Sequence, residues 1–184
     1  MPRSSEAAPA DTATAYVGLG ANLGDPRAAL DAALASLAAL PGTRLTATSS
    51  IYRSAPVDAD GPDFLNAVAR LETALAPQAL LEALLAIERT YGRERPYRNA
   101  PRTLDLDLLL HGEQRLATAA LTLPHPRLHE RAFVLRPLAE LAPGLQVPGR
   151  GFVGALLEAV GGQSIDRLDD DLPARVARPA ADGA

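Results

Sequence analysis

Hydrophobic and polar positions follow two different periods along the chain, and the changes of period divide it into predicted elements. Leucines spaced three and four residues apart predict one helix from Asp25-Pro26 to Pro41-Gly42 and another from about Pro77 to Tyr91. Alternating or β-branched stretches predict strands at the following positions: residues 16–20, 43–53, 64–73 and 101–110. Two further helices are expected at residues 133–141 and 152–160. Residues 1–13 and 169–184 are expected to be disordered tails around a single domain, residues 14–168.

The element order of this domain is strand, helix, strand, strand, helix, strand. That order predicts an α+β fold, the ferredoxin-like split βαβ sandwich, in which a mainly antiparallel sheet carries its helices on one face. This fold hosts many unrelated functions, so the chemistry has to be inferred from particular residues.

The strand at residues 101–110 carries the most informative chemical signal. Its leucines at 104, 106 and 108 should face the core, so Asp105 and Asp107 share the other face. Carboxylates about 7 Å apart on one strand are costly neighbours unless a cation lies between them. Oxygen ligands with open positions suit Mg²⁺ that carries substrate phosphates. The plainer alternative is a surface strand with two solvated aspartates.

An arginine-rich stretch runs directly into this strand. Fourteen residues contain Arg89, Arg93, Arg95, Arg98 and Arg102. Such a stretch suits a metal–polyphosphate site, where carboxylates hold the metal and guanidinium groups hold phosphate oxygens. A helix C-terminus explains Arg89 alone. The chain contains no lysine, which excludes a P-loop lysine, a kinase strand lysine and a Schiff-base lysine.

Composition narrows the functional class further. A net charge of −4 argues against a general nucleic-acid binder. The absence of cysteine excludes disulfides, thiolate nucleophiles and cysteine-type zinc sites. No apolar run reaches the length of a membrane span, and the first residues lack the apolar core of a signal peptide. We therefore expect a cytoplasmic monomer with neither nucleic-acid nor membrane partners.

Three aromatic or polar side chains suggest a binding site for a heterocycle. Phe64 and Asn66 face the same way on the strand at 64–73, and an aromatic face beside an amide suits a flat heterocycle. Phe133 could supply the opposite face of the stack. The plainer interpretation makes both phenylalanines core residues and Asn66 a turn residue. His125, between two prolines, could donate a hydrogen bond to a phosphate.

With these residues in view, the chain resembles the 6-hydroxymethyl-7,8-dihydropterin pyrophosphokinases of folate biosynthesis over roughly residues 15–165. The run Pro101 to Asp107 is the most specific block of the resemblance. The other blocks occur in the expected order: residues 18–24, 49–56, 63–67, 87–89 and 92–93, Pro124-His125, and residues 131–133.

The resemblance implies transfer of diphosphate from ATP to the pterin hydroxymethyl group, with release of AMP. It implies two Mg²⁺ ions on Asp105 and Asp107, with Arg93 and Arg102 as further catalytic residues. The positions that match the ATP site are Glu88, Arg93, Arg95, Arg102, Leu108, Thr122, His125 and Arg131. The positions that match the pterin site are Ser54, Ala55, Pro56, Val57, Phe64, Asn66 and Phe133.

The chain also departs from the family pattern. Asn99 replaces a usual tryptophan and Ala100 a usual glycine, which bears on closure over the nucleotide, and Pro126 replaces a common tyrosine. Two other functions stay open at this point. One is a nucleotide-binding regulatory module without turnover, and the other is a single-stranded RNA binder on the same fold.

Overall fold

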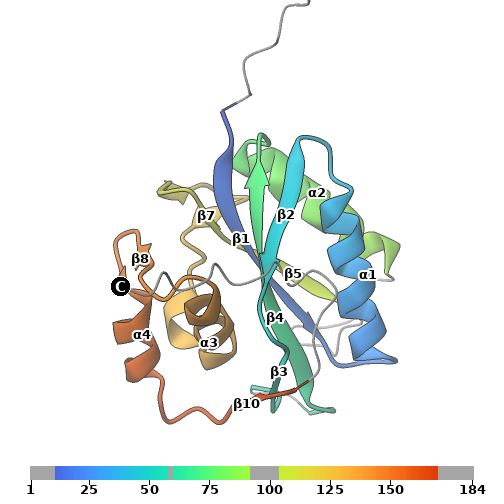
Figure 1. Cartoon of the computed structure of the whole chain (residues 1–184), viewed down its shortest axis with the longest axis vertical. Helices are drawn as coiled ribbons and strands as arrows, with labels where there is room; N and C mark the ends of the chain where they lie inside the picture. The colour runs from blue at the N-terminus through green and yellow to red at the C-terminus, as the bar shows by residue number, and fades with distance from the viewer. Residues whose placement is uncertain (1–10, 58–59, 92–103, 170–184) are drawn as a thin grey trace, which may run out of the picture.

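A computed structural model describes residues 11–57, 60–91 and 104–169 of the 184-residue chain (Figure 1). The longer strands are β1 (Ala13–Ala21), β2 (Thr43–Thr48), β3 (Tyr52–Ser54), β4 (Phe64–Thr73) and β5 (Asp105–His111). The two-residue strands are β6 (Leu116–Ala117), β7 (Thr122–Leu123), β8 (Gln146–Val147), β9 (Gly151–Phe152) and β10 (Asp166–Arg167). The helices are α1 (Pro26–Ala38), α2 (Pro77–Thr90), α3 (Ala132–Leu141), α4 (Val153–Ala159) and the 3₁₀ turn η1 (Leu128–Glu130).

The main sheet has the strand order β10-β3-β4-β1-β5, and β2 also pairs with β4. Every pairing in it is antiparallel. The order β2-β4-β1-β5, with α1 after β1 and α2 after β4, is the split βαβ arrangement. The predicted fold class is confirmed.

The predicted strand at residues 43–53 is wrong in one respect, because it consists of two strands that pair with different stretches of β4. Ser49 lies at the break. Its Oγ accepts the Val68 N–H at 2.9 Å and donates to the Ser50 carbonyl at 2.8 Å. A serine side chain that bonds the backbone in this way competes with the regular ladder of a strand. After this interruption, β3 pairs with β4 on one side and with β10 on the other.

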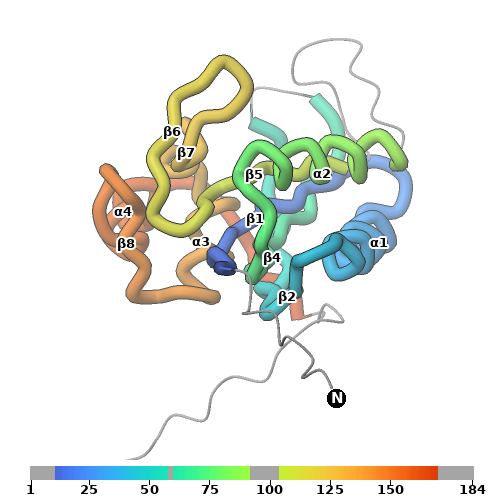
Figure 2. The backbone as a smooth tube through the Cα atoms, turned by 90° about the horizontal axis from the view of Figure 1, so that it is seen from above, coloured from blue at the N-terminus to red at the C-terminus, as the bar shows by residue number. Residues whose placement is uncertain are grey.

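Helices cover both faces of the sheet, which corrects the expectation of a single covered face. Figure 1 and Figure 2 show α1 and α2 on one side and α3 and α4 on the other. The central strands are apolar on both faces. Val17 and Leu19 belong to the core under α1 and α2, whereas Tyr16 and Val68 belong to the core under α3. A strand that is buried on both faces needs a layer on each side.

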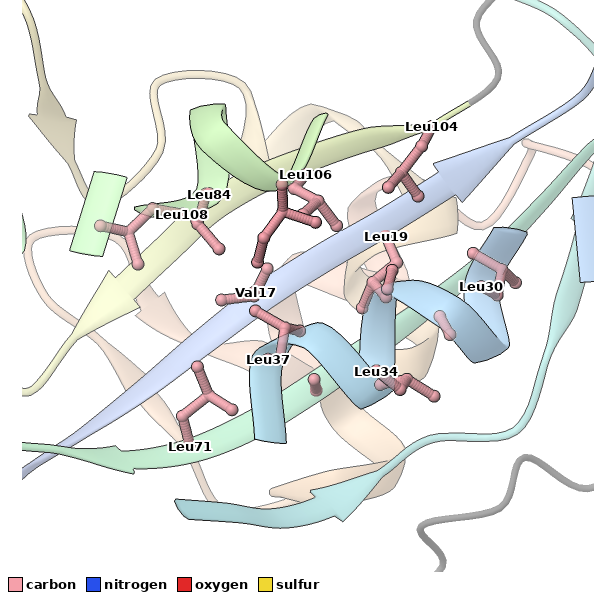
Figure 3. Packing of buried hydrophobic residues seen from close by; sticks show 14 of the residues in the cluster. Val17, Leu19, Leu30, Leu34, Leu37, Leu71, Leu84, Leu104, Leu106 and Leu108 are labelled. Carbon is pink, nitrogen blue, oxygen red and sulfur yellow. The ribbon is translucent and has the colours of Figure 1, made fainter. Parts of the chain in front are cut away.

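The first helix forms where its caps and leucines predict. The Asp25 side chain accepts the Ala28 N–H at 3.0 Å, and Pro26 occupies the first turn. Leu30, Leu34 and Leu37 then point into the core (Figure 3). Each buried leucine contributes on the order of 2 kcal/mol. None of the helices that the structure describes is both long and apolar enough to cross a membrane.

Candidate active site

The acidic face of β5 is arranged as the alternation predicts. Leu104, Leu106 and Leu108 are at most 4% exposed, whereas Asp105 and Asp107 are only half-buried. Both carboxylates therefore lie on the face of the sheet opposite α2, next to the start of α3. The predicted positions before residue 104 lie outside the described residues.

Glycines on the neighbouring strand leave space beside the two carboxylates. Asp105 pairs with Gly20 of β1 and Asp107 with Gly18. On the other side of β1, Gly20 pairs with Asn66 of β4. Asp105 and Asn66 are therefore two strand spacings apart, about 10 Å, and the residue between them has no side chain. A Cβ at Gly20 would come within 3.5 Å of the Asn66 amide oxygen. These glycines form the floor of a cavity.

This first cavity has a volume of about 490 Å³, within the usual range for small-ligand pockets. It is lined by all seven residues predicted for the pterin site, namely Ser54, Ala55, Pro56, Val57, Phe64, Asn66 and Phe133. Asp105, Asp107 and Arg131 line it as well. Phe64 enters from the sheet and Phe133 from the first turn of α3. The structure thus brings together aromatic side chains that are far apart in the sequence.

The Asn66 amide has a defined orientation in the wall of this cavity. Its Nδ2 donates to the Ser54 hydroxyl at 2.8 Å and to the Tyr52 carbonyl at 3.3 Å. A backbone carbonyl only accepts hydrogen bonds, so the amide nitrogen has to face it. The amide oxygen accepts no hydrogen bond from the described residues, and it lies on the Gly20 side. It is available to a ligand that carries N–H donors.

Arg131 connects the aromatic wall to the acidic strand. Its guanidinium carbon lies 5.5 Å from the centre of the Phe133 ring, a cation–π distance. One of its nitrogens, Nη1, is 3.9 Å from Asp107 Oδ2. Arg131, which the resemblance assigns to the ATP site, lines the first cavity beside Asp107. It holds a positive charge between the Phe133 ring and the Asp107 carboxylate.

A second cavity of about 300 Å³ opens on the other side of Asp107. Four of the residues predicted for the ATP site line it: Glu88, Leu108, Thr122 and His125. Asp107 borders both cavities, whereas Asp105 borders only the first. Arg93, Arg95 and Arg102, together with Asn99 and Ala100, lie outside the described residues.

His125 is a neutral hydrogen-bond donor beside Asp107, where the two cavities adjoin. Burial, and then the charge of Arg131, lower the pKa of His125 to about 4. Its Nδ1 accepts the Arg127 N–H at 3.2 Å, which places the ring proton on Nε2. Nε2 lies 3.8 Å from Asp107 Oδ1. The imidazole can therefore donate toward a carboxylate or a phosphate without carrying a charge.

Glu88 fixes the strand between the two aspartates. The residue is only 2% exposed, and its Oε1 accepts the Leu106 N–H at 2.8 Å. This hydrogen bond replaces the missing ladder partner on the outer edge of β5 and joins α2 to it. The resemblance assigns Glu88 to the ATP site alone, and no pattern in the sequence predicts this structural contact.

Other lining residues carry little or no sequence signal. Gly18 and Gly20 belong to the block 18–24 of the family resemblance, but only the strand register places them opposite the aspartates. Gln163 and Ser164 line the first cavity from the segment after α4. Gln163 Oε1 accepts the Ala132 N–H at 2.9 Å, and its Nε2 donates to the Glu130 carbonyl at 2.7 Å. It thereby caps the start of α3.

The acid pair fits a magnesium ion that is shared with a substrate. No cluster of three or more histidine, cysteine, aspartate or glutamate side chains that could hold a metal occurs in residues 11–57, 60–91 and 104–169. Mg²⁺ commonly binds through one or two carboxylates and completes its octahedron with water and phosphate oxygens. Asp105 and Asp107 supply that number of hard ligands at a half-exposed position.

An α+β fold with two adjoining cavities that share a carboxylate suits a group-transfer enzyme that holds two substrates side by side. Residues 16–143 match the family described as 7,8-dihydro-6-hydroxymethylpterin-pyrophosphokinase. The chain belongs to this family, which confirms the resemblance seen in the sequence.

Individual relatives agree with this assignment. A Pseudomonas aeruginosa protein named 2-amino-4-hydroxy-6-hydroxymethyldihydropteridine pyrophosphokinase is 51% identical over 154 residues, covering 83% of this chain and 95% of the relative. A Haemophilus influenzae protein of the same name is 42% identical over 157 residues, covering 85% and 98%.

Solved structures support the fold. A crystal structure of Plasmodium falciparum HPPK-DHPS is similar with a TM-score of 0.64 at 16% identity. The match covers 85% of this chain and 45% of the Plasmodium chain. At that identity the similarity bears on the fold alone, which it confirms.

Proposed function

We propose that this chain transfers diphosphate from ATP to the hydroxymethyl group of 6-hydroxymethyl-7,8-dihydropterin, with the pterin in the first cavity and ATP in the second. Membership of the pyrophosphokinase family makes it an ATP-dependent diphosphate transferase of folate biosynthesis. The observation that carries the site assignment is the position of Asp107, which borders both cavities. Substrates bound on its two sides would meet at this carboxylate.

The first cavity provides contacts that suit a pterin ring. Phe64 and Phe133 line it from the sheet and from α3, and aromatic rings stack well on a flat heterocycle. The Asn66 amide oxygen accepts a ring N–H, because its Nδ2 already bonds Ser54 and Tyr52. An amide held in this way discriminates against rings that offer an acceptor at the same position.

Asp105 and Asp107 would hold the two Mg²⁺ ions, which supply electrostatic stabilisation of the phosphates and of the attacking alcohol. The new bond joins the hydroxymethyl oxygen to the β-phosphorus of ATP. The bond from that phosphorus to the oxygen bridging to the α-phosphorus breaks, AMP leaves with that oxygen, and the proton of the hydroxymethyl group is released to solvent. Phosphoryl transfer of this kind depends mainly on positioning and charge stabilisation.

The side chains around Asp107 are proposed to help position the phosphates and stabilise their charge. The Arg131 charge lies close enough to balance negative charge that gathers between the two cavities. Neutral His125 has its Nε2 proton available for a hydrogen bond to a phosphate in the second cavity. Arg93 and Arg102 are proposed to contact the transferring phosphates, and Arg95 is proposed to contribute to ATP binding. We also propose that the enzyme works as a cytoplasmic monomer.

The decisive assay measures AMP released from ATP with and without the dihydropterin, in Mg²⁺ and after chelation with EDTA. AMP formation that requires both the pterin and Mg²⁺ is the expected result. ATP binding without AMP formation would instead indicate a regulatory module. Binding of single-stranded RNA at physiological salt, with no response to the pterin, would indicate an RNA-binding protein.

A further inference from the structure

The two walls of the first cavity belong to different parts of the fold. Ser54 and Asn66 stand on β3 and β4, whereas Phe133 stands on the first turn of α3. The width of the first cavity between these two walls depends on how α3 packs on the sheet. Apolar packing holds the middle of the helix through Leu135 and Leu138. Apolar contacts are non-directional, so they fix the distance between a helix and the sheet better than they fix the position of the helix along the strands.

A polar contact near the C-terminus of α3 fixes the position of the helix along the strands. Glu140 Oε1 accepts the Ser50 N–H at 3.0 Å and the Ser50 hydroxyl at 2.9 Å, and Oε2 accepts the Tyr52 hydroxyl at 2.6 Å. Arg167 of β10 donates to the same Ser50 hydroxyl at 3.0 Å. One carboxylate therefore joins α3 to the segment that leads into β3 and, through Ser50, to β10.

Tyr52 connects Glu140 to the Asn66 side-chain amide in the cavity wall. Its side chain donates to Glu140, and its backbone carbonyl accepts the Asn66 Nδ2 at 3.3 Å. Strand β3 has only three residues and pairs with β4 through Tyr52, Arg53 and Ser54. Such a short strand is weakly held by its ladder alone. Glu140 adds one hydrogen bond to Tyr52 of this strand and two to Ser50, which lies two residues before it.

The position of Glu140 along α3 relates it to Phe133. The two residues are seven positions apart, which places them on one helix face about 10 Å apart along the axis. Between them, Pro137 has no N–H with which to bond the Phe133 carbonyl. The pocket end of the helix is therefore less firmly joined to the rest than in a regular helix. A fixed point at Glu140 limits how far the helix can tilt or slide.

The charge of Glu140 is maintained by its donors. Burial by itself would raise the pKa of Glu140, but the hydrogen bonds from Tyr52 and Ser50 lower it below its usual value. A negative charge in the last turn of a helix is otherwise unfavourable, because it faces the negative end of the helix dipole. Burial, and then the Glu140 hydrogen bond, raise the pKa of Tyr52, which keeps its hydroxyl a donor.

We propose that Glu140 is a positioning residue of the pterin cavity, which holds β3 against α3 so that Asn66 and Phe133 keep the spacing and orientation that a bound pterin needs. This proposal rests on the proposed function of the first cavity. Glu140 does not line that cavity, so it acts through Tyr52 and through α3.

The test compares Glu140→Ala and Glu140→Gln with wild type, using KM for the pterin, KM for ATP and direct pterin binding by fluorescence. Glu140→Ala should raise the pterin KM about tenfold, equivalent to ~1.4 kcal/mol, and leave the ATP KM within about twofold. Glu140→Gln should give a smaller rise, because its amide oxygen replaces only one of the two acceptors.

Two further variants make the result specific. Glu72→Gln is the matched control, because Glu72 accepts a hydrogen bond from Thr14 at 2.7 Å near the opposite end of β4. It should change neither KM. Tyr52→Phe removes a single donor to Glu140 and should raise the pterin KM by less than Glu140→Ala, which tests the proposal even if the alanine variant fails to fold.

An unchanged pterin KM in Glu140→Ala and Tyr52→Phe would overturn the proposal. So would a parallel rise of both KM values, because that result indicates general loss of structure. A wild-type protein that binds the pterin but releases no AMP would contradict the proposed function, and the fluorescence comparison of the Glu140 variants would still decide this proposal.

Discussion

Replacing Asp107 by asparagine separates its role in catalysis from its role in stability. The substitution keeps the size of the side chain and removes its charge. Asp107 lies 3.8 Å from His125 and 3.9 Å from Arg131. Two unit charges at about 4 Å interact by roughly 4 kcal/mol at an effective dielectric constant of 20. Because the Asp107 side chain is 32% exposed and His125 is neutral, screening reduces the net stabilisation to about 1 kcal/mol or less.

The expected loss of activity is much larger. Removing one group that is aligned with charge developing in the transition state typically costs about 100-fold to 1,000-fold in turnover, or roughly 3–4 kcal/mol. We therefore expect Asp107→Asn to lower AMP release at least about 100-fold. The unfolding free energy should change by less than about 1 kcal/mol, which corresponds to at most about 4 °C in Tm for a domain of this size.

The assay combines AMP release at saturating substrates with chemical and thermal unfolding. Asp31→Asn is a suitable control, since Asp31 pairs with Arg27 at 3.3 Å on α1 and its side chain is 39% exposed, similar to Asp107. It should retain full activity. More than a tenth of wild-type activity in Asp107→Asn, or a loss of activity that matches a loss of folded protein, would refute the reasoning.

Other substitutions test neighbouring parts of the site. Asn66→Ala should weaken pterin binding about tenfold, as expected for the loss of a hydrogen bond, and leave ATP binding nearly unchanged; equal losses in calorimetric titrations would make Asn66 purely structural. Glu88→Gln keeps an acceptor for the Leu106 N–H, whereas Glu88→Leu removes it. Hydrogen exchange of the Leu106 amide, measured by NMR, should therefore be at least about tenfold faster in Glu88→Leu only. Equal exchange rates in the two variants would contradict this role of Glu88. From the sequence pattern, Arg102→Ala should weaken ATP binding and slow the reaction, whereas Arg93→Ala should slow single-turnover chemistry with little change in ATP affinity; a loss of ATP affinity alone in Arg93→Ala would make that residue a binding clamp.

The local pattern of hydrophobic and polar residues was sufficient to predict the helices and strands and the face that Asp105 and Asp107 share. The alternation around Asp105 and Asp107 predicts which side chains share a face, because the period of a strand is a property of the extended backbone itself. The start of α1 was likewise predictable, since Asp25 and Pro26 act within one turn. The order of these elements was enough to predict the split βαβ topology, which few alternatives satisfy.

Non-local contacts were beyond the reach of such patterns. The sequence pattern predicts one strand at residues 43–53, because it does not show that the Ser49 side chain bonds the Val68 N–H across the sheet. The same pattern predicts helices on one face of the sheet only, because periodicity within a single strand does not show how many layers pack on the sheet.

The chain sequence by itself therefore determined the helices and strands, their order, the acid pair and the residue types of a heterocycle site. The tertiary structure decided that Asp107 borders both cavities, that Gly18 and Gly20 form the floor of the first cavity beside the two aspartates, and that Glu140 contacts Ser50 ninety positions away. The physical reason is that periodicity and capping act within a few residues. Strand register and the packing of α3 depend on the whole set of long-range contacts, which form together when the chain folds.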